Sequence, residues 1–143
     1  MSYTKNATIL FNLIPLLDKT FVRAIDQQFR VILTATQARV MGILIEKKAT
    51  MTELSNEMLM SKQQMTPIVD KLVLKGFVQR EYDAIDRRII KISLTPSGVE
   101  ILEEVKVKTL AFLENKLKHL DQDDLSSLTN ALTDLCKVIN KIT

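Results

Sequence analysis

Apolar side chains recur at helical spacing near the start of the chain. Leu10, Leu13, Leu17, Phe21, Ile25 and Phe29 follow one another at intervals of three or four residues, which places them on one face of a helix. This spacing predicts a long first helix over about residues 6–29. Pro15 lies inside that range and is expected to kink the helix or delay its start, because proline has no backbone N–H to donate.

Three matches to the capping box follow, each ahead of an apolar periodic run. In this motif a hydroxyl side chain accepts a hydrogen bond from the backbone N–H three residues later. The side chain of that later residue accepts one from the backbone N–H of the hydroxyl residue. The boxes predict helices near 35–46, 51–58 and 62–75, with Gly76 ending the last. Only Leu59-Met60 and their flanks join the second and third, which is helix-turn-helix spacing without the usual turn glycine. The three boxes are Thr34-x-x-Gln37, Thr50-x-x-Glu53 and Ser61-x-x-Gln64.

Two strands are predicted next, over 77–82 and 89–94. In the second, Ile90, Ile92 and Leu94 alternate with Lys91 and Ser93, so one face is expected to be buried and the other wet. The turn between the strands contains the adjacent arginines Arg87 and Arg88. Arginines on a projecting ribbon suit a narrow, negatively charged groove, and this points to nucleic acid.

The last part of the chain predicts two further helices. Thr95-Pro96 and Asp121 have the character of helix starts. The final helix has an apolar seam with heptad-like spacing, which suits packing against another helix. It either folds back on the first helix or interleaves with a second copy, and the dimer is favoured because a two-fold protein can contact two half-sites of a palindrome. Cys136 adjoins this seam, and a buried packing role is expected for it. The seam is Leu125, Leu128, Leu132, Leu135, Ile139 and Ile142.

Composition and charge sharpen this picture. A chain of 143 residues predicts one domain. The net charge is only +3, but residues 1–98 contain 14 basic and 9 acidic side chains, whereas residues 99–143 contain 6 and 8. The basic excess therefore lies in the part with the arginine turn, as a phosphate-binding surface requires. Scarce aromatic residues disfavour a base-stacking platform for single strands.

The sequence lacks the residues that a metal site, an enzyme active site or a membrane segment would need. His119 and Cys136 are single and far apart, so neither a structural zinc site nor a nucleophilic active site is expected. No enzyme activity and no cofactor are predicted. No signal-peptide pattern and no apolar run of membrane-spanning length occur, so a cytoplasmic protein without a membrane partner is expected.

Residues 33–98 resemble the multiple antibiotic resistance regulator (MarR) family of bacterial winged-helix transcription factors. The resemblance implies a mainly α fold with a small β-wing, in which 33–98 form the winged helix-turn-helix DNA-binding lobe. Residues 1–32 and 99–143 would form the dimerisation region of a homodimer on a palindromic operator. It implies a repressor released by a small anionic or phenolic ligand; release by cysteine oxidation is disfavoured, because the first 46 residues contain no cysteine. The motifs concerned are Leu33-Thr34-x-x-Gln37, the segment Asp70–Arg80, and Asp83-x-x-Asp86-Arg87-Arg88 continuing into Leu94-Thr95-x-x-Gly98.

The 62–75 helix is the predicted recognition helix. If Met65, Ile68, Val69 and Leu72 are buried, Gln63 faces outward and is the best candidate for pairing with adenine in the major groove. The helix contains no arginine for guanine, so an A·T-rich operator is predicted. Pro67 either interrupts the helix or starts a new one at Thr66-Pro67. The DNA-contacting candidates on this helix are Ser61, Lys62, Gln63, Gln64, Thr66 and Lys71; the Gln64 amide is occupied if the capping box forms.

The wing supplies three more candidates. Arg88 is expected in the minor groove, where narrow A·T tracts concentrate negative potential. Asp86 is expected to hold Arg88 or Arg87 in position. The alternative function is a winged helix whose wing arginines bind an acidic protein partner. Arg23, Arg30 and Arg39 are possible anchors for an anionic effector, but the sequence does not select among them, so no ligand-binding residue is assigned.

Overall fold

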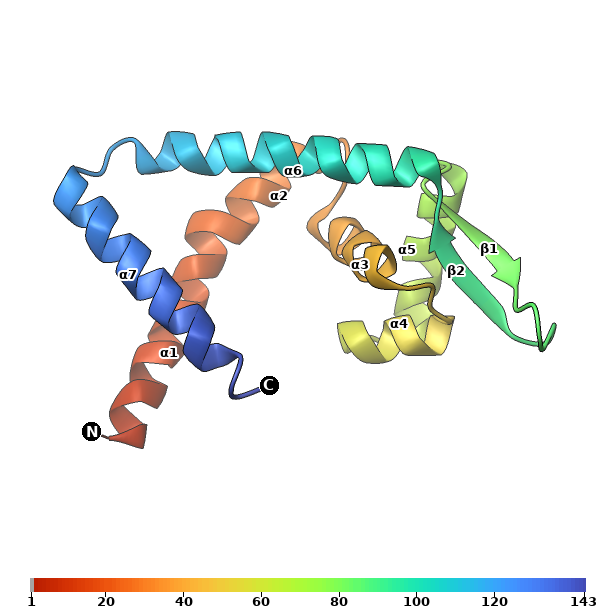
Figure 1. Ribbon diagram of the computed structural model, residues 1–143, viewed down its shortest axis with the longest axis horizontal. Coiled ribbons are helices and arrows are strands. Elements are labelled where there is room, and N and C mark those ends of the chain that lie inside the picture. The colour runs from red at the N-terminus through yellow and green to blue at the C-terminus, as the bar shows by residue number, and fades with distance from the viewer. Residues whose placement is uncertain (1) are drawn as a thin grey trace. The chain divides into compact units, whose positions relative to one another are not determined.

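The structure is a computed structural model that describes residues 2–143 (Figure 1). The chain divides into two compact units, of which the first ends at Lys108 and the second begins at Thr109. The elements are α1 (Tyr3–Leu17), the π-helix η1 (Asp18–Val22), α2 (Arg23–Phe29), α3 (Ala35–Glu46), α4 (Met51–Met58), α5 (Lys62–Leu74), β1 (Val78–Tyr82), β2 (Ile90–Leu94), α6 (Pro96–Leu117) and α7 (Gln122–Ile139). The prediction of a mainly α fold with a two-stranded ribbon is confirmed.

The first predicted helix is present but begins earlier than 6. The hydroxyl of Ser2 accepts a hydrogen bond of 3.3 Å from the Lys5 N–H and caps α1. A late start at Pro15 is therefore wrong, since Pro15 lies within α1. The disturbance appears three residues later, where α1 widens into η1 and the Asp18 N–H bonds to the carbonyls of Ile14 and Pro15. A missing donor at a proline is a known cause of such local rearrangement.

Local capping explains where the three middle helices begin. Thr34, Thr50 and Ser61 each accept a hydrogen bond from the N–H three residues ahead. The predicted bounds agree with α3 and α4, and α5 ends one residue before the predicted limit. The reciprocal bond forms at Thr34 and Ser61, whereas the Glu53 carboxylate contacts the Thr50 hydroxyl, at 3.2 Å.

The core of the first unit lies between α3, α4, α5 and the base of the ribbon. Ile101 and Leu102 of α6 pack against it. Burial of this apolar surface is the main stabilising contribution of the lobe. The buried apolar residues are Leu33, Val40, Met41, Leu44, Ala49, Leu54, Met58, Met65, Val69, Leu72, Val78, Ile92 and Val105.

The ribbon is antiparallel, with Arg80 opposite Ile92 and Tyr82 opposite Ile90. Ala49 pairs with Ile92 on the outer edge of β2 through two backbone hydrogen bonds of 3.1 and 2.7 Å. The predicted alternation along β2 is wrong: Ile90 is 46% exposed while Ser93 is buried. The reason is that the ribbon projects from the lobe, so that both faces are covered at its base and neither near its tip.

The junction between the ribbon and α6 is tightly closed. Gly76 ends α5 in the left-handed region, with φ at 77°. The Thr95 hydroxyl donates to the Gly76 carbonyl at 2.6 Å and accepts from the Gly98 N–H at 3.0 Å. A Cβ on Gly98 would lie 2.0 Å from the Phe77 carbonyl oxygen, so only glycine fits there. Thr95 thus joins three segments and starts α6 as predicted.

The second unit contains the end of α6 and α7. Asp121 caps α7 by accepting from the Asp124 N–H at 2.8 Å, as predicted. No residue of α7 is buried within the described chain. Cys136 is exposed within a single chain, and the buried packing role expected for it stays a prediction.

Candidate nucleic-acid interface

The start of α5 is held by a complete capping box. The Ser61 hydroxyl accepts from the Gln64 N–H at 3.1 Å, and the Gln64 side-chain oxygen accepts from the Ser61 N–H at 3.0 Å. These bonds satisfy two backbone donors that the first turn of a helix leaves unpaired. The helix therefore starts at Lys62, and Lys62 and Gln63 are exposed on its first turn.

One side of α5 is buried and the other is open. Met65, Val69 and Leu72 are fully buried, and Ile68 is half-buried, which confirms the predicted stripe. The six predicted DNA-contacting residues of this helix are all exposed. Their roles toward DNA stay predictions.

Three of these six side chains already have local partners. Ser61 and Gln64 bond to each other, and the Thr66 hydroxyl donates to the Lys62 carbonyl at 2.8 Å. Lys62 and Lys71 form no ion pair within residues 2–143. The exposed side chains with charge or amide groups to offer are therefore Lys62, Gln63 and Lys71.

Pro67 lies inside α5. Because the helix is continuous from Lys62, the alternative of a second start at Thr66-Pro67 is wrong. Proline supplies no N–H, so the Gln63 carbonyl lacks its usual helical donor. That carbonyl belongs to the residue predicted to contact a base.

Asp83 organises the wing turn from its first residue. Its side chain accepts hydrogen bonds of 3.0 Å from the N–H groups of Ile85 and Asp86, and Lys91 on β2 lies 3.3 Å from its other oxygen. The Asp86 N–H, then that of Ile85, then the Lys91 ammonium hold the pKa of the Asp83 carboxyl below its ordinary value. Two backbone donors are thereby satisfied within the turn.

Asp86 holds Arg88 and not Arg87. Nε and Nη2 of Arg88 lie 3.1 Å from Oδ1 and Oδ2 of Asp86, respectively, and the Arg88 N–H also donates to Oδ1 at 3.1 Å. This fork lowers the pKa of Asp86 and raises that of Arg88. The Arg88 side chain is still 91% exposed, so Asp86 fixes its direction without covering it. The question of which arginine Asp86 holds is settled by this contact.

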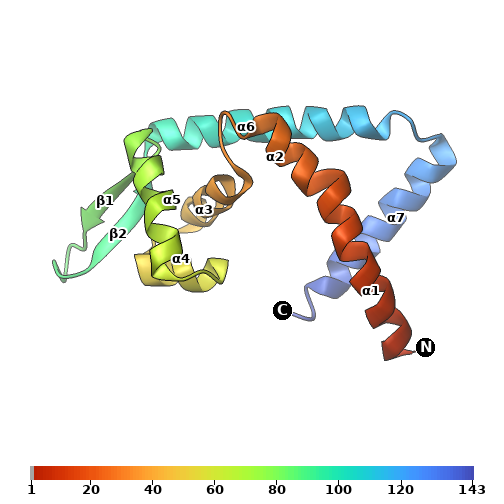
Figure 2. The same ribbon diagram turned by 180° about the vertical axis from the view of Figure 1, so that it is seen from behind.

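Arg87 and Ile85 occupy the rest of the wing tip. Arg87 is exposed and has no ion pair among the residues that the structure describes. Ile85 is 98% exposed. Figures 1 and 2 show this tip and the α4–α5 turn on the same side of the first unit, below α3 and the base of the ribbon. The first turn of α5 and the wing arginines can thus face one extended partner together.

Two contacts in this region were not predicted from the sequence. Arg80 of β1 donates to Asp70 of α5 at 2.6 Å, and the Lys75 ammonium donates to the Ile32 carbonyl at 3.2 Å. Both partners of the first pair are in the segment that resembles the MarR family, but the sequence does not indicate that they meet. Lys75 therefore has a structural role that its charge alone did not indicate.

The sequence is similar to those of known transcription regulators of one family. The MarR family model matches residues 33–89. The chain is 31% identical over 93 residues to the HTH-type transcriptional regulator SarZ of Staphylococcus haemolyticus, which covers 65% of this chain and 62% of SarZ. It is 30% identical over 98 residues to the multiple antibiotic resistance protein MarR of Salmonella typhimurium, covering 67% of this chain and 68% of that protein. The chain belongs to the MarR family. For two of the curated relatives, SarZ among them, the chain spans only about three fifths of the relative's length.

The MarR-family fold extends beyond the segment matched by sequence. The crystal structure of wild-type MarR from E. coli in its apo form superposes with a TM-score of 0.75 at 25% identity, and covers 88% of this chain and 96% of that one. The fold class predicted from the sequence is confirmed. The family match itself includes α5 and the wing turn up to Ile89.

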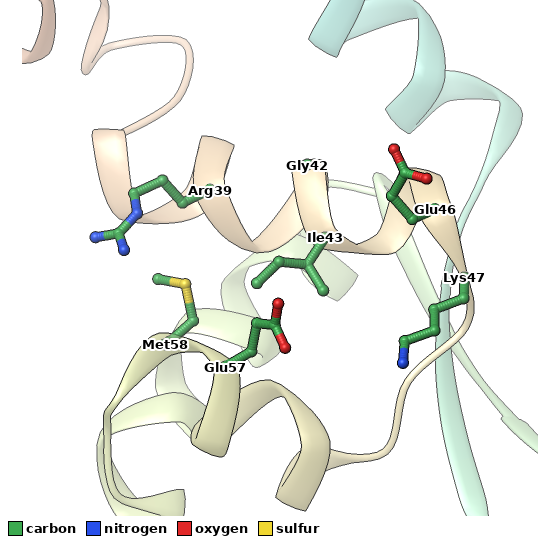
Figure 3. Close-up of a pocket in the computed structure, with 7 residues that line it drawn as sticks. All are labelled: Arg39, Gly42, Ile43, Glu46, Lys47, Glu57 and Met58. Carbon is green, nitrogen blue, oxygen red and sulfur yellow. The ribbon is translucent and has the colours of Figure 1, made fainter. Parts of the chain in front are cut away.

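This MarR-family chain also has two grooves, one within the winged lobe and one at its boundary with the first helices. One of about 450 Å³ lies between α3 and α4, where Arg39 and Ile43 are opposite Met58 and Glu57 (Figure 3). Another, of about 370 Å³, is lined by Arg23, Arg30 and the start of α3. Arg23 and Arg30 pair with Asp18 and Asp26, whereas Arg39 has no ion pair within residues 2–143. Arg39 is thus the least neutralised of the three candidate anion anchors.

Residues 2–143 show neither a metal-binding cluster nor a membrane-spanning helix. No three His, Cys, Asp or Glu side chains gather in a way that could hold a metal ion. No helix in this range is both long and apolar enough to cross a membrane.

Proposed function

We propose that this MarR-family chain is a sequence-specific, double-stranded-DNA-binding transcription regulator that acts as a homodimeric repressor. The observation that supports it most directly is that two segments with exposed basic residues lie on the same side of the first unit (Figures 1 and 2). They are the first turn of α5 and the wing tip, which contains Arg87 and Arg88. Duplex DNA offers a phosphate backbone for the basic groups and two grooves that a helix and a wing can enter. The relatives SarZ and MarR are named as a transcriptional regulator and a resistance protein.

In this proposal α5 enters the major groove with its first turn. Gln63 pairs with adenine, while Lys62 and Lys71 contact phosphates. Ser61, Gln64 and Thr66 contribute less through their side chains, because these groups are bonded within the helix. These residues lie near the N-terminal end of α5, where backbone N–H groups can bind a phosphate.

The wing enters the minor groove through Arg88. Its guanidinium is 91% exposed and already oriented by Asp86, so little side-chain freedom is lost when it binds. Arg87, which has no described ion partner, contacts the adjacent phosphates. Minor grooves narrow in A·T tracts, so the proposed operator is A·T-rich.

Dimerisation is assigned to residues 1–32 and 99–143, leaving 33–98 as the DNA-binding lobe. The support is unburied apolar surface in each part: Phe11 and Ile14 of α1 are 77% and 65% exposed, and Leu132 of α7 is 48% exposed. Exposed apolar surface on this scale marks an interaction site. Two identical lobes would then contact the half-sites of a palindrome.

Regulation is assigned to a small anionic or phenolic ligand that releases the DNA. Arg39 in the groove between α3 and α4 (Figure 3) has no ion pair among the described residues and lies next to the apolar Ile43 and Met58. A negatively charged aromatic compound needs this combination. The groove is also lined by Lys47 and by the carboxylates Glu46 and Glu57.

Selection from a pool of random duplexes tests the function. We expect an A·T-rich palindrome that binds two chains, with affinity falling steeply as salt increases. G·C-rich half-sites would contradict the assignment of Gln63 and Arg88. If no duplex is enriched and the chain instead captures acidic proteins, the winged helix is a protein-interaction module.

A further inference from the structure

Leu59 adopts an unusual conformation in the turn of the helix-turn-helix. Its φ and ψ are 55° and 42°, in the left-handed region, and within the described chain no other non-glycine residue has a positive φ. The turn is closed by hydrogen bonds from the Leu59 N–H to the Asn56 carbonyl, 3.3 Å, and from the Met60 N–H to the Ser55 carbonyl, 2.9 Å. Left-handed geometry brings Cβ close to the following carbonyl oxygen, which disfavours leucine and leaves glycine unaffected.

The side chain of Leu59 gains almost nothing in return from the rest of the chain. It is 94% exposed, so neither burial nor packing within the chain offsets the strained backbone. Met60, which follows it, packs on the core. The left-handed conformation itself ends α4, but glycine would adopt it without strain, so the turn does not explain why this position has an exposed leucine.

The position of Leu59 indicates what it contacts. It comes two residues before Ser61, the cap of α5, and is therefore next to the exposed Lys62 and Gln63. At the other end of the same side of this unit, the wing tip presents Ile85, which is 98% exposed (Figures 1 and 2). Each exposed aliphatic side chain thus stands beside the basic groups of one of the two contact sites.

We infer that Leu59 is an apolar DNA contact that packs against the deoxyribose faces beside the phosphates bound by the first turn of α5. The inference rests on the proposed function and adds a contact to it. The C–H faces of the sugar are the apolar part of the backbone, and the exposed side chain of Leu59 belongs to the turn that directly precedes the cap of α5. Such a contact adds affinity without neutralising a phosphate, so it is independent of salt.

The test uses the full chain and a labelled duplex that the wild type selected from a random pool. Leu59→Gly and Leu59→Asn both tolerate left-handed geometry and both remove the aliphatic group; Leu59→Met retains one. We expect the first two to weaken binding roughly fivefold for each lobe engaged, and Leu59→Met to bind within about twofold of wild type. The slope of log K against log salt should not change in any of them.

Leu74 provides a matched control. It is an exposed leucine, at 86%, at the opposite end of α5. Leu74→Asn should bind the duplex as the wild type does. The midpoint of thermal unfolding of Leu59→Gly should equal or exceed that of the wild type, because glycine relieves the strain.

Each contrary outcome has a distinct meaning. Wild-type affinity in both Leu59→Gly and Leu59→Asn overturns the inference, and so does a loss confined to Leu59→Gly, which would indicate stiffness of the turn. A flattened salt slope in Leu59→Asn also overturns it, because the change would then act through charged contacts. A wild-type chain that enriches no duplex overturns the proposed function itself, and this inference with it.

Discussion

Arg80 of β1 and Asp70 of α5 form a 2.6 Å hydrogen-bonded ion pair that ties the wing to the helix beside it. The two residues are ten apart in sequence, and their side chains are 36% and 52% exposed. The pair links the ribbon to α5, and we expect it to help set the direction in which the ribbon leaves the lobe. In the proposed complex two separate contact sites meet one duplex, so the angle between β1 and α5 matters more there than the energy of the pair.

A double-mutant cycle should measure that pair. With Asp70→Asn and Arg80→Gln we expect a coupling of about 0.5–1 kcal/mol in the free energy of unfolding, reduced by added salt because both groups are partly solvated. The control is the exposed pair of Lys108 and Glu104 within α6, where about 0.3–0.5 kcal/mol is typical. Zero coupling between Asp70 and Arg80 would mean that the ion pair does not set the wing angle.

The starts of the helices were predictable because capping is local. A hydroxyl at Thr34 or Ser61 and an amide three residues later meet as soon as the first turn forms, whatever the remainder of the chain does. The continuity of α5 through Pro67 was not predictable in this way. It depends on Met65, Val69 and Leu72, which are buried on both sides of the proline and hold the helix in one piece.

The sequence predicted which residues belong to the candidate site, but only part of the contacts that these residues make. The wing motif identified Asp86, Arg87 and Arg88, but which arginine Asp86 holds depends on the exact path of the turn, which Asp83 sets through two backbone N–H groups. The pairing of Asp70 with Arg80 depends on how α5 packs against β1. Periodicity reports which face of an element is buried, and it contains no information on such contacts between elements.

Replacement of Arg88 should separate DNA binding from folding. Because its side chain is 91% exposed, we expect Arg88→Ala to leave the unfolding midpoint almost unchanged and to weaken operator binding by about 1–3 kcal/mol. Arg88→Lys should recover little, since lysine cannot form the two-pronged contact with Asp86. Arg23→Ala, at an exposed arginine outside the winged lobe, is the control; equal losses in the two alanine variants would indicate a general charge effect.

Removal of Arg88 should change the pKa of one wing carboxyl group, Asp86, and leave that of the other, Asp83, low. The pKa of Asp86 lies below its ordinary value chiefly because the Arg88 side chain donates to it, so Arg88→Ala should raise it, as measured by carbon NMR. The pKa of Asp83 is lowered first by backbone N–H groups and should stay low in the same variant. A carboxyl with a lowered pKa stabilises the folded form above its unfolded-state pKa, and this stabilisation is lost as the pH falls through the folded value. The order of the wing should therefore persist at neutral pH and decline only in acid.

Removal of a cap should change stability alone. Thr34→Ala removes the hydroxyl that accepts from the Gln37 N–H at 3.1 Å in a partly buried box, and we expect a loss of about 1–2 kcal/mol in the free energy of unfolding, measured by urea denaturation. Thr50→Ala, whose box is exposed and lacks the reciprocal backbone bond, should cost less, about 0.5–1 kcal/mol. Affinity for DNA should be unaffected by the first change at temperatures where the chain remains folded. A Thr50→Ala variant that is less stable than Thr34→Ala would contradict this ranking.

Pro67→Ala should stabilise the chain and sharpen the first turns of α5. Alanine supplies the N–H that the Gln63 carbonyl lacks and has the highest helix propensity, so we expect a gain of about 1 kcal/mol or more, below the ~3 kcal/mol cost of a proline forced into an ideal helix interior. Hydrogen exchange at residue 67 should show a protected amide. Pro15→Ala in α1, the other proline inside a helix, is the control for the stability effect, because it lies outside the winged lobe. If Pro67→Ala gains stability but binds DNA more weakly, the interface depends on the shape that the proline gives to the first turns of α5.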